Sequence, residues 1–412
     1  MEGMVCDYLE RLLEPCLPAD FLASVWAKKH FYVRGWPGKF SPLLPWKQLN
    51  EILRRHRLDF PRLRLMRDGK SLPTSSYLRY ASGGGSRKTP VPRLRSAELE
   101  RHLREGATLV LDAVDELYRP LEELAEGLEL TFRERVQINT YAGWRTSRGF
   151  DLHWDDHDVF ILQVAGRKRW SVYGMTRPHP LVGDANVNPK PTGAPVWEET
   201  LEDGDLLYIP RGHWHVALPL DEPTLHLTVG IHNRTGLDLL GWLTGRLRAS
   251  EIFRKDLPRF AGATERAAYL EDLRAELLNN WDASLLEGYL GELDESAEPR
   301  PRPGLPYAAT DALLPPSTNA VVRLLAPRPL ELHLNDGVIE FSCMKRKWRF
   351  AREAELILRP LAERRASTVS ELCEAARGRL EEKRVLAFLR ELAAHGLVAV
   401  EESQDEETDV RR

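Results

Sequence analysis

Short apolar runs separated by turn residues occupy residues 106–233. β-Branched and aromatic side chains are frequent in these runs, and Gly, Pro, Asn or Asp stands between them, as expected for short strands. The pattern predicts an antiparallel sandwich or barrel with strands at 108–111, 136–141, 159–164, 169–173, 206–209 and 225–231. Residues 178–195, rich in Pro, Gly and Asn, are expected to form a long loop on this scaffold.

Helical periodicity replaces this pattern on both sides of the central region. Near the N-terminus, Asp20 is positioned to cap a helix that carries Phe21, Leu22, Val25 and Trp26. After residue 233, Thr264 is expected to cap another helix. The apolar stripe of that helix predicts contact with the core or with a second copy of the chain: Leu270, Leu273, Leu277 and Trp281.

Four prolines between residues 294 and 306 mark a linker before a last domain. In that domain Thr368 and Glu371 form the pattern of a capping box, and a further apolar helix stops at Gly396 before a strand at 397–400. Two helices followed by a strand indicate a small winged-helix-like unit, although many such units bind no DNA. The basic residues around Trp348 suit a solvated strand face better than contact with a polyanion: Lys345, Arg346, Lys347 and Arg349.

The charges are nearly balanced, with 62 acidic and 58 basic side chains in 412 residues. The last thirteen residues carry six carboxylates against two arginines, so the rest of the chain sums to zero, and nucleic acid is not an expected partner. No apolar run reaches about 18 residues and no signal peptide begins the sequence, which predicts a cytoplasmic protein without a membrane contact. Four dispersed cysteines without a C-x-x-C pair give no indication of a disulfide framework or a structural zinc site.

The strongest indication of a functional site is the motif His153-x-Asp155. It is followed further along the chain by a Gly-Asp turn, a Pro-x-Gly turn and His215. If residues 153 and 155 belong to one strand, both side chains point to the same face. Two imidazoles and one carboxylate on one side of a cation leave about three coordination positions open, which is typical of non-haem Fe(II) oxygenases. An open zinc site stays possible, and His213 would replace His215 if the strand were irregular.

The motifs together resemble the JmjC 2-oxoglutarate oxygenases of the cupin fold, specifically the ribosomal-oxygenase branch. They are Asn139-x-Tyr141, His153-x-Asp155-Asp, Phe160-Ile-Leu-Gln163, Gly166-x-Lys168-x-Trp170, Gly204-Asp-Leu-Leu-Tyr-Ile-Pro-Arg-Gly212 with His215, and His226-Leu-Thr228. The resemblance implies an α+β protein with a double-stranded β-helix (jelly-roll) core. Its expected parts are a catalytic domain with N-terminal helices at 1–233, a helical dimerisation region at 234–295, a winged-helix-like domain at 306–402 and an acidic tail at 403–412.

The same resemblance implies the cofactors and the residues that hold them. Fe(II) is expected on His153, Asp155 and His215, and the co-substrate 2-oxoglutarate on Lys168, whose ammonium would pair with the distal carboxylate. Three further positions match the co-substrate pocket: Asn139, Tyr141 and Thr228. His157 is expected behind the ligands or on the pocket wall, and His226 is expected to be structural. Gly230 departs from the family, in which a hydroxyl residue is common at this position.

The expected function is therefore that of a dioxygenase, a homodimeric hydroxylase of a protein or peptide side chain, with a ribosomal protein as the leading substrate. One alternative is a tailoring hydroxylase of a ribosomally made peptide precursor. Another is a non-catalytic cupin-type regulator that binds DNA through its last domain, which the neutral body of the chain disfavours.

Overall fold

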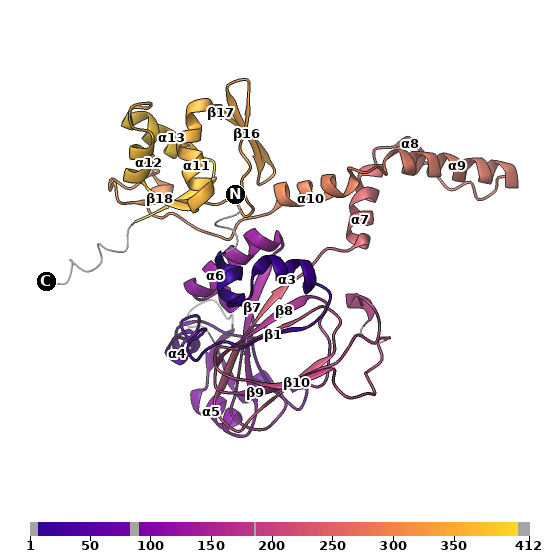
Figure 1. Cartoon of the computed structure of the whole chain (residues 1–412), viewed down its shortest axis with the longest axis vertical. Coiled ribbons are helices and arrows are strands. Elements are labelled where there is room, and N and C mark those ends of the chain that lie inside the picture. Colours follow the sequence, from indigo (N-terminus) through magenta and orange to yellow (C-terminus); the bar gives the residue numbers. More distant parts are fainter. Residues whose placement is uncertain (1–6, 83–89, 185–186, 403–412) are drawn as a thin grey trace. The chain divides into compact units, whose positions relative to one another are not determined.

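A computed structural model gives the fold of the chain and describes residues 7–82, 90–184 and 187–402 (Figure 1). The acidic tail at 403–412 lies outside the described residues. Internal contacts divide the chain between Asn233 and Arg234 into two units. Among the described helices, none has the length and apolar character needed to cross a membrane.

Two sheets build the first unit. The larger has eight strands in the order β1-β11-β8-β13-β7-β6-β2-β3, with bounds Phe31–Val33 (β1), Leu63–Arg67 (β2), Lys70–Ser71 (β3), Thr108–Leu111 (β6), Val136–Gly143 (β7), Asp158–Ala165 (β8), Leu206–Ile209 (β11) and Thr224–Ile231 (β13). The smaller has the order β10-β9-β12, with Lys168–Val172 (β9), Trp197–Leu201 (β10) and His215–Pro219 (β12). A separate hairpin joins Leu78–Ser82 (β4) to Pro90–Leu94 (β5). The pairing is antiparallel throughout the two sheets, as the strand spacing predicted.

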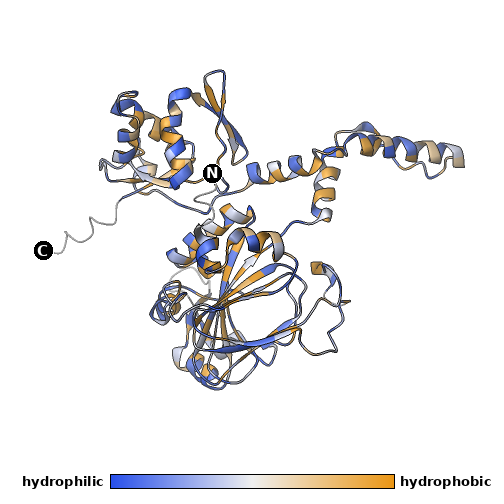
Figure 2. Cartoon of the chain, viewed as in Figure 1, coloured by the Kyte–Doolittle hydropathy of each residue, from blue (hydrophilic) through white to orange (hydrophobic). Residues whose placement is uncertain are grey.

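Alternation along β8 explains how this one strand packs in two hydrophobic cores. Val159 and Ile161 pack in a small core with Trp170 of β9, whereas Phe160 and Leu162 pack in the main core with helical residues. Because successive side chains of a strand point to opposite faces, one strand that is buried on both faces can serve both cores. Apolar residues accordingly follow the central strands in Figure 2.

Helices cover the main-core face of the larger sheet (Figure 1). They are α2 (Asp7–Leu13), α3 (Pro18–Ser24) and α6 (Arg119–Phe132), and two further helices of this unit are α4 (Trp46–Arg55) and α5 (Ser96–Arg104). The prediction that Asp20 caps a helix is wrong. Leu17 is the N-cap residue of α3 and Pro18 occupies the first turn, where its missing N–H has no consequence, so Asp20 falls inside the helix.

The Gly204-Asp205 turn packs against the N-terminal segment that contains β1 and holds the start of β11 next to it. Gly204 has φ +92°, and a Cβ there would lie 1.9 Å from the carbonyl oxygen of Trp36, so glycine is required. The buried carboxylate of Asp205 accepts hydrogen bonds from the Tyr32 hydroxyl and from the backbone N–H of Gly35, both at 2.9 Å. This turn fixes the start of β11, the strand that leads toward His215.

The second unit begins with helices and ends with a mixed domain. The helices are α7 (Gly236–Leu247), α8 (Glu251–Arg254), α9 (Ala263–Asn279) and α10 (Leu285–Ser296). Thr264 is not the cap of α9, because the N-cap residue is Gly262. None of the residues of α9 is buried within this chain, so the predicted apolar stripe is not part of a core in the single copy.

The mixed domain holds two three-stranded sheets and three helices. The first sheet has the order β18-β14-β19, with Val321–Leu324 (β14), Ala366–Thr368 (β18) and Val398–Glu401 (β19), and the second joins His333–Asn335 (β15), Val338–Cys343 (β16) and Arg346–Ala351 (β17). The helices are α11 (Glu355–Arg364), α12 (Val369–Ala375) and α13 (Glu382–Ala394). The Thr368–Glu371 capping box is confirmed, and Trp348 is buried while its basic neighbours are exposed, which agrees with a solvated strand face.

Candidate active site

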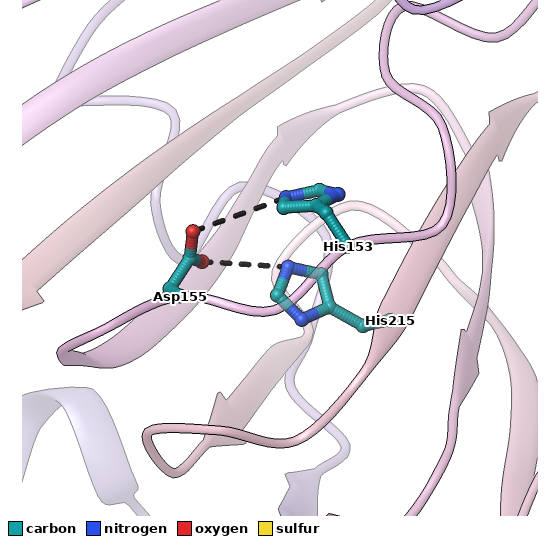
Figure 3. Close-up of side chains that lie close together, drawn as sticks. All are labelled: His153, Asp155 and His215. Carbon is teal, nitrogen blue, oxygen red and sulfur yellow. Dashed lines mark ion pairs between the residues drawn. The ribbon is translucent and has the colours of Figure 1, made fainter. Parts of the chain in front are cut away.

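His153, Asp155 and His215 come together at the open edge of the smaller sheet and are called the triad from here on (Figure 3). Nε2 of His215 lies 3.4 Å from Oδ2 of Asp155, and Nε2 of His153 lies 3.9 Å from Oδ1 of the same carboxylate. One ligand atom from each residue can be chosen so that all three lie within 4.8 Å of one another. These separations suit three ligands that share one cation.

Each imidazole of the triad is held by its other nitrogen. Nδ1 of His153 lies 2.8 Å from the carbonyl oxygen of Asp151, and Nδ1 of His215 lies 3.0 Å from that of His213. A carbonyl oxygen only accepts, so each Nδ1 must carry the proton and each Nε2 keeps its lone pair. This is the arrangement by which proteins orient histidine ligands of metals.

The chain reaches this geometry in a way that the sequence pattern did not indicate. His153 belongs to no strand, and Asp155 follows it in the loop before β8. The prediction that the two residues share one face of a strand is therefore wrong. A single antiparallel bridge between His153 and His215 replaces the strand, and the Gly212 N–H donates to the Asp155 carbonyl oxygen at 2.9 Å.

The charges of the triad suit a divalent cation. Burial lowers the pKa of His215 to about 4, so that imidazole is neutral at neutral pH and can bind a metal. Burial acts to raise the pKa of Asp155, but the adjacent imidazoles of His215 and His153 act in the opposite direction, and the net pKa is lowered. The triad thus offers an ionised carboxylate beside neutral imidazole.

A cavity of about 260 Å³ adjoins the triad. Besides the triad, its wall consists of Arg64, Thr108, Tyr141, Gly149, Phe150, Ile161, Lys168, Trp170, Ala217, His226 and Thr228. Lys168 is 6% exposed, and burial lowers the pKa of its ammonium group to about 7. In the part of the chain that the structure describes, no carboxylate pairs with this lysine.

Three of the four predicted co-substrate residues reach this wall: Lys168, Tyr141 and Thr228. Asn139 is not on it. Its Oδ1 accepts hydrogen bonds from the backbone N–H of Ala113 and from the Gln137 amide, both at 2.9 Å. Asn139 and Tyr141 are two residues apart on β7, so their side chains lie next to each other on one face of the strand.

Several wall residues were not predicted. Arg64 reaches the cavity from β2 and pairs with Asp112 through two hydrogen bonds of 2.6 and 2.8 Å. His226, predicted to be structural, also lies on the wall, where its ring stacks on Tyr141 at 4.9 Å. The indole of Trp170 meets the His226 ring edge to face. Alternation along β9 places Trp170 on the same face as Lys168, and alternation along β13 places His226 on the same face as Thr228. The sequence therefore contained the information needed to predict these two wall residues.

Two neighbouring histidines have other positions. His213 contributes its carbonyl oxygen to His215 and is not itself a member of the triad. His157 is not on the cavity wall; its ring lies where a side chain at Gly230 would be, with a Cβ only 2.9 Å from Nε2 and Cδ2 of the imidazole. The missing side chain at position 230 therefore makes room for His157.

Comparison with known proteins identifies this region. Residues 117–239, which include the triad and most of the cavity wall, match the JmjC domain family. The chain contains a JmjC domain. The curated relatives of this domain include Ribosomal oxygenase 1 of Gallus gallus, 32% identical over 229 residues, and the bifunctional lysine-specific demethylase and histidyl-hydroxylase NO66 of Dictyostelium discoideum, 30% identical over 264 residues. The similarity covers 54% and 61% of this chain but only 36% and 49% of the two relatives.

A solved structure shares the fold outside the JmjC domain as well. The ribosomal oxygenase YcfD of Escherichia coli matches 93% of this chain and 98% of its own, with a TM-score of 0.54 and 22% identity. Another structure of YcfD contains cobalt and 2-oxoglutarate and has a TM-score of 0.52. The cupin-type JmjC fold expected from the motifs is thus confirmed.

Proposed function

We propose that the chain is an Fe(II)- and 2-oxoglutarate-dependent hydroxylase that acts on a side chain of a ribosomal protein. The observation that carries the proposal is the triad beside a cavity whose most deeply buried cation, Lys168, has no carboxylate partner among the described residues. A buried ammonium without a counter-charge costs free energy unless a ligand supplies the charge.

The residues present fit the metal and the co-substrate. The triad supplies two nitrogen donors and one oxygen donor, the set that suits non-haem iron, and the lone pairs on Nε2 are available to it. A dicarboxylate in the cavity would give Lys168 its missing partner. Two buried polar atoms of wall residues, Nε1 of Trp170 and Nδ1 of His226, also have no hydrogen-bond partner in the described part of the chain.

When bound, iron and 2-oxoglutarate would activate dioxygen, which is the oxidant: one oxygen atom would enter the substrate C–H bond, and the other would enter succinate as 2-oxoglutarate loses carbon dioxide. The side chains of the protein hold the ligand in position and keep water away from it. We expect Lys168 to bind the distal carboxylate, and the hydroxyl groups of Tyr141 and Thr228, which line the cavity, to hydrogen-bond the ligand. Burial raises the pKa of Tyr141, so its hydroxyl stays protonated and can donate. The aromatic wall of Trp170 and His226 excludes water from one side of the site.

The substrate class comes from the relatives. Their names describe a ribosomal oxygenase and a histidyl-hydroxylase, and the E. coli structure of the same fold is also a ribosomal oxygenase. We infer that a side chain of a ribosomal protein enters beside His153, whose side chain is the most exposed of the triad at 40%. A ribosomal substrate also favours a cytoplasmic location.

The test is a turnover assay with the purified full chain, Fe(II), ascorbate, 2-oxoglutarate and a fraction of ribosomal proteins. Succinate should form, and one ribosomal protein should gain the mass of one oxygen atom. The His153→Ala variant should show neither. If succinate forms without a mass gain on any ribosomal protein, the substrate is a different one, such as a peptide precursor. If the wild-type chain forms no succinate under any condition, the proposed activity is refuted.

We also propose that α7–α10, residues 234–295, form a homodimer interface. Phe260 is 98% exposed, Leu257 77% and Leu270 63%, which is unusual for a surface that stays in water. Replacing Phe260 by Ser should shift the full chain toward the monomer in light scattering, whereas Phe60→Ser, at a site that is 60% exposed in the first unit, should not. A wild-type chain that is monomeric at micromolar concentration would contradict the proposal.

The mixed domain at 306–402 is proposed to be winged-helix-like. Its support is the succession of two helices, α12 and α13, and the strand β19, which pairs with β14. The balanced charge of the chain does not favour nucleic acid as its ligand. A salt-sensitive shift of a DNA probe by the full chain, unaffected by His153→Ala, would instead support a regulator.

A further inference from the structure

Three further side chains with metal-binding groups gather next to the JmjC active site: Asp156, His157 and His232. They share no residue with the triad. In the antiparallel ladder between β8 and β13, Asp158 faces Ile231 and Val159 faces Gly230. One step beyond the end of this ladder, His157 faces His232. Directly opposed residues of two antiparallel strands have Cβ atoms about 4.5–5.5 Å apart, close enough for both imidazoles to reach one ion.

The positions of the side chains agree with this register. The imidazole rings of His157 and His232 have centroids 4.3 Å apart. Nδ1 of His157 lies 2.9 Å from Oδ1 of Asp156. These two atoms share a hydrogen bond and ion pair, and two ligands at right angles on metal bonds of about 2.1 Å are also roughly 3.0 Å apart, so a metal ion that displaces the shared proton can bind between them.

The surroundings keep the cluster open and in place. The side chain of Asp156 is 31% exposed and that of His157 22%, and His232 is exposed, so an ion can enter from solvent. Gly230 provides the space for the His157 ring, because a Cβ there would lie 2.9 Å from Nε2. A glycine at this strand position thus accommodates a histidine that the cavity does not use.

We propose that Asp156, His157 and His232 bind a divalent transition-metal ion at a site of its own. Two imidazoles and one carboxylate favour the borderline ions Zn²⁺, Co²⁺ and Ni²⁺ over Mg²⁺ or Ca²⁺. The bound ion joins the start of β8 to the end of β13 and so stabilises the strand ends next to the loop that carries Asp155. This site does not depend on the proposed hydroxylase activity.

Cobalt binding by the metal-free full chain tests the site, with the ion counted by equilibrium dialysis and its ligands followed by visible absorption. A His153→Ala/His215→Ala variant, which lacks the triad, should retain one tightly bound Co²⁺. Adding His232→Ala should abolish that binding, whereas adding His56→Ala, at an exposed histidine after α4, should not. If the triad variant binds no cobalt, or if binding survives His232→Ala, the proposal is overturned.

Two further measurements guard against a folding artefact. Asp156→Asn keeps the size of the side chain and should weaken cobalt binding to the triad variant by about tenfold or more, the range for loss of a neighbouring metal partner. Cobalt should also raise the melting temperature of the triad variant, because an ion that binds only the folded chain must stabilise it. Unchanged affinity in Asp156→Asn, or no thermal shift with cobalt, would rule out this ligand set.

Discussion

His153 and His215 pair through their backbones as well as their side chains. The N–H of His215 donates to the carbonyl oxygen of His153 at 2.7 Å, and the reverse hydrogen bond measures 3.1 Å. This bridge holds the two imidazoles with ring centroids 4.4 Å apart before any ion binds. Two ligands distant in the sequence are therefore preorganised by main-chain hydrogen bonds, which side-chain substitutions leave in place.

Removing a triad ligand should abolish turnover without unfolding the chain. His215→Ala, Asp155→Ala and His153→Ala each take away one of three donors, so iron affinity should fall by more than the ~10–100-fold that loss of an outer partner costs. Iron content after dialysis and succinate formation are the measurements. His56→Ala, an exposed histidine in the same unit, should retain both. Full turnover in any of the three triad variants contradicts the assignment.

Lys168→Met should have opposite effects on co-substrate binding and on stability. Loss of the ammonium removes the proposed charge partner of 2-oxoglutarate, with an expected penalty of about 2–5 kcal/mol in binding. The ligand-free variant should nevertheless melt at a higher temperature, because a buried charge is replaced by an apolar chain of similar length. Titration calorimetry and thermal melts of the metal-loaded and metal-free chain check both. Equal 2-oxoglutarate affinity in the variant would exclude Lys168 as the carboxylate partner.

The buried position of Lys168 also predicts that the free energy of unfolding depends on pH. Burial lowers the pKa of Lys168 from 10.5 to about 7 in the ligand-free fold, so between these values the unfolded chain holds a proton that the folded chain has lost. The contribution of Lys168 to the free energy of unfolding must then rise with pH across this window, and its penalty is complete below pH 7. Denaturant titrations at several pH values should show a steeper rise in the wild type than in Lys168→Met. Parallel curves would contradict the shift.

Binding of 2-oxoglutarate should weaken as pH rises above about 7, because the ligand needs the charged ammonium that the free site increasingly loses. For a single linked proton the limit is a tenfold loss per pH unit. Affinity measured between pH 7 and 9 at constant ionic strength provides the check. A pH-independent affinity, with Lys168→Met still impaired, would show that the lysine keeps its proton in the free chain.

Asp158 should matter for the metal although it does not bind one. This buried carboxylate accepts hydrogen bonds from the backbone N–H of Arg211 at 2.6 Å and from the Asn233 amide at 2.5 Å, and so ties the turn before His215 to β8. Asp158→Ala leaves those donors unpaired and should cost about 1–3 kcal/mol of stability and lower the iron affinity. Asp158→Asn, which keeps one acceptor oxygen, should lose less of both. Identical iron affinity in wild type and Asp158→Ala would contradict the link.

The sequence was sufficient to predict the central strands and the three residues of the triad. It was not sufficient to predict the path of the loop that carries His153 and Asp155. Val136 to Gly143 and Thr224 to Ile231 have the apolar content of central strands, and both were located nearly to the residue. The short strands β1 and β10 were not predicted, because neither shows a regular alternation of apolar and polar residues. Their place is decided by pairing with distant strands.

The departures at the site have similar causes. His153 and Asp155 are two residues apart, and an alternating pattern cannot distinguish a strand from a loop held by one bridge. Asn139 was expected in the pocket, yet its amide oxygen accepts a hydrogen bond from the backbone N–H of Ala113, which a sequence pattern does not place near it. Arg64 reaches the cavity from a strand far upstream. Such contacts depend on tertiary packing, which overrides local pattern.

The two imidazoles of the triad differ in their access to solvent: the His215 side chain is 5% exposed and the His153 side chain 40%. If the proposed oxygenase reaction runs without a substrate, we expect reactive oxygen species to oxidise the more accessible of these two imidazoles first. Oxidative damage that accumulates with time should therefore appear on His153 and spare His215. Adding fresh iron alone would then not restore activity.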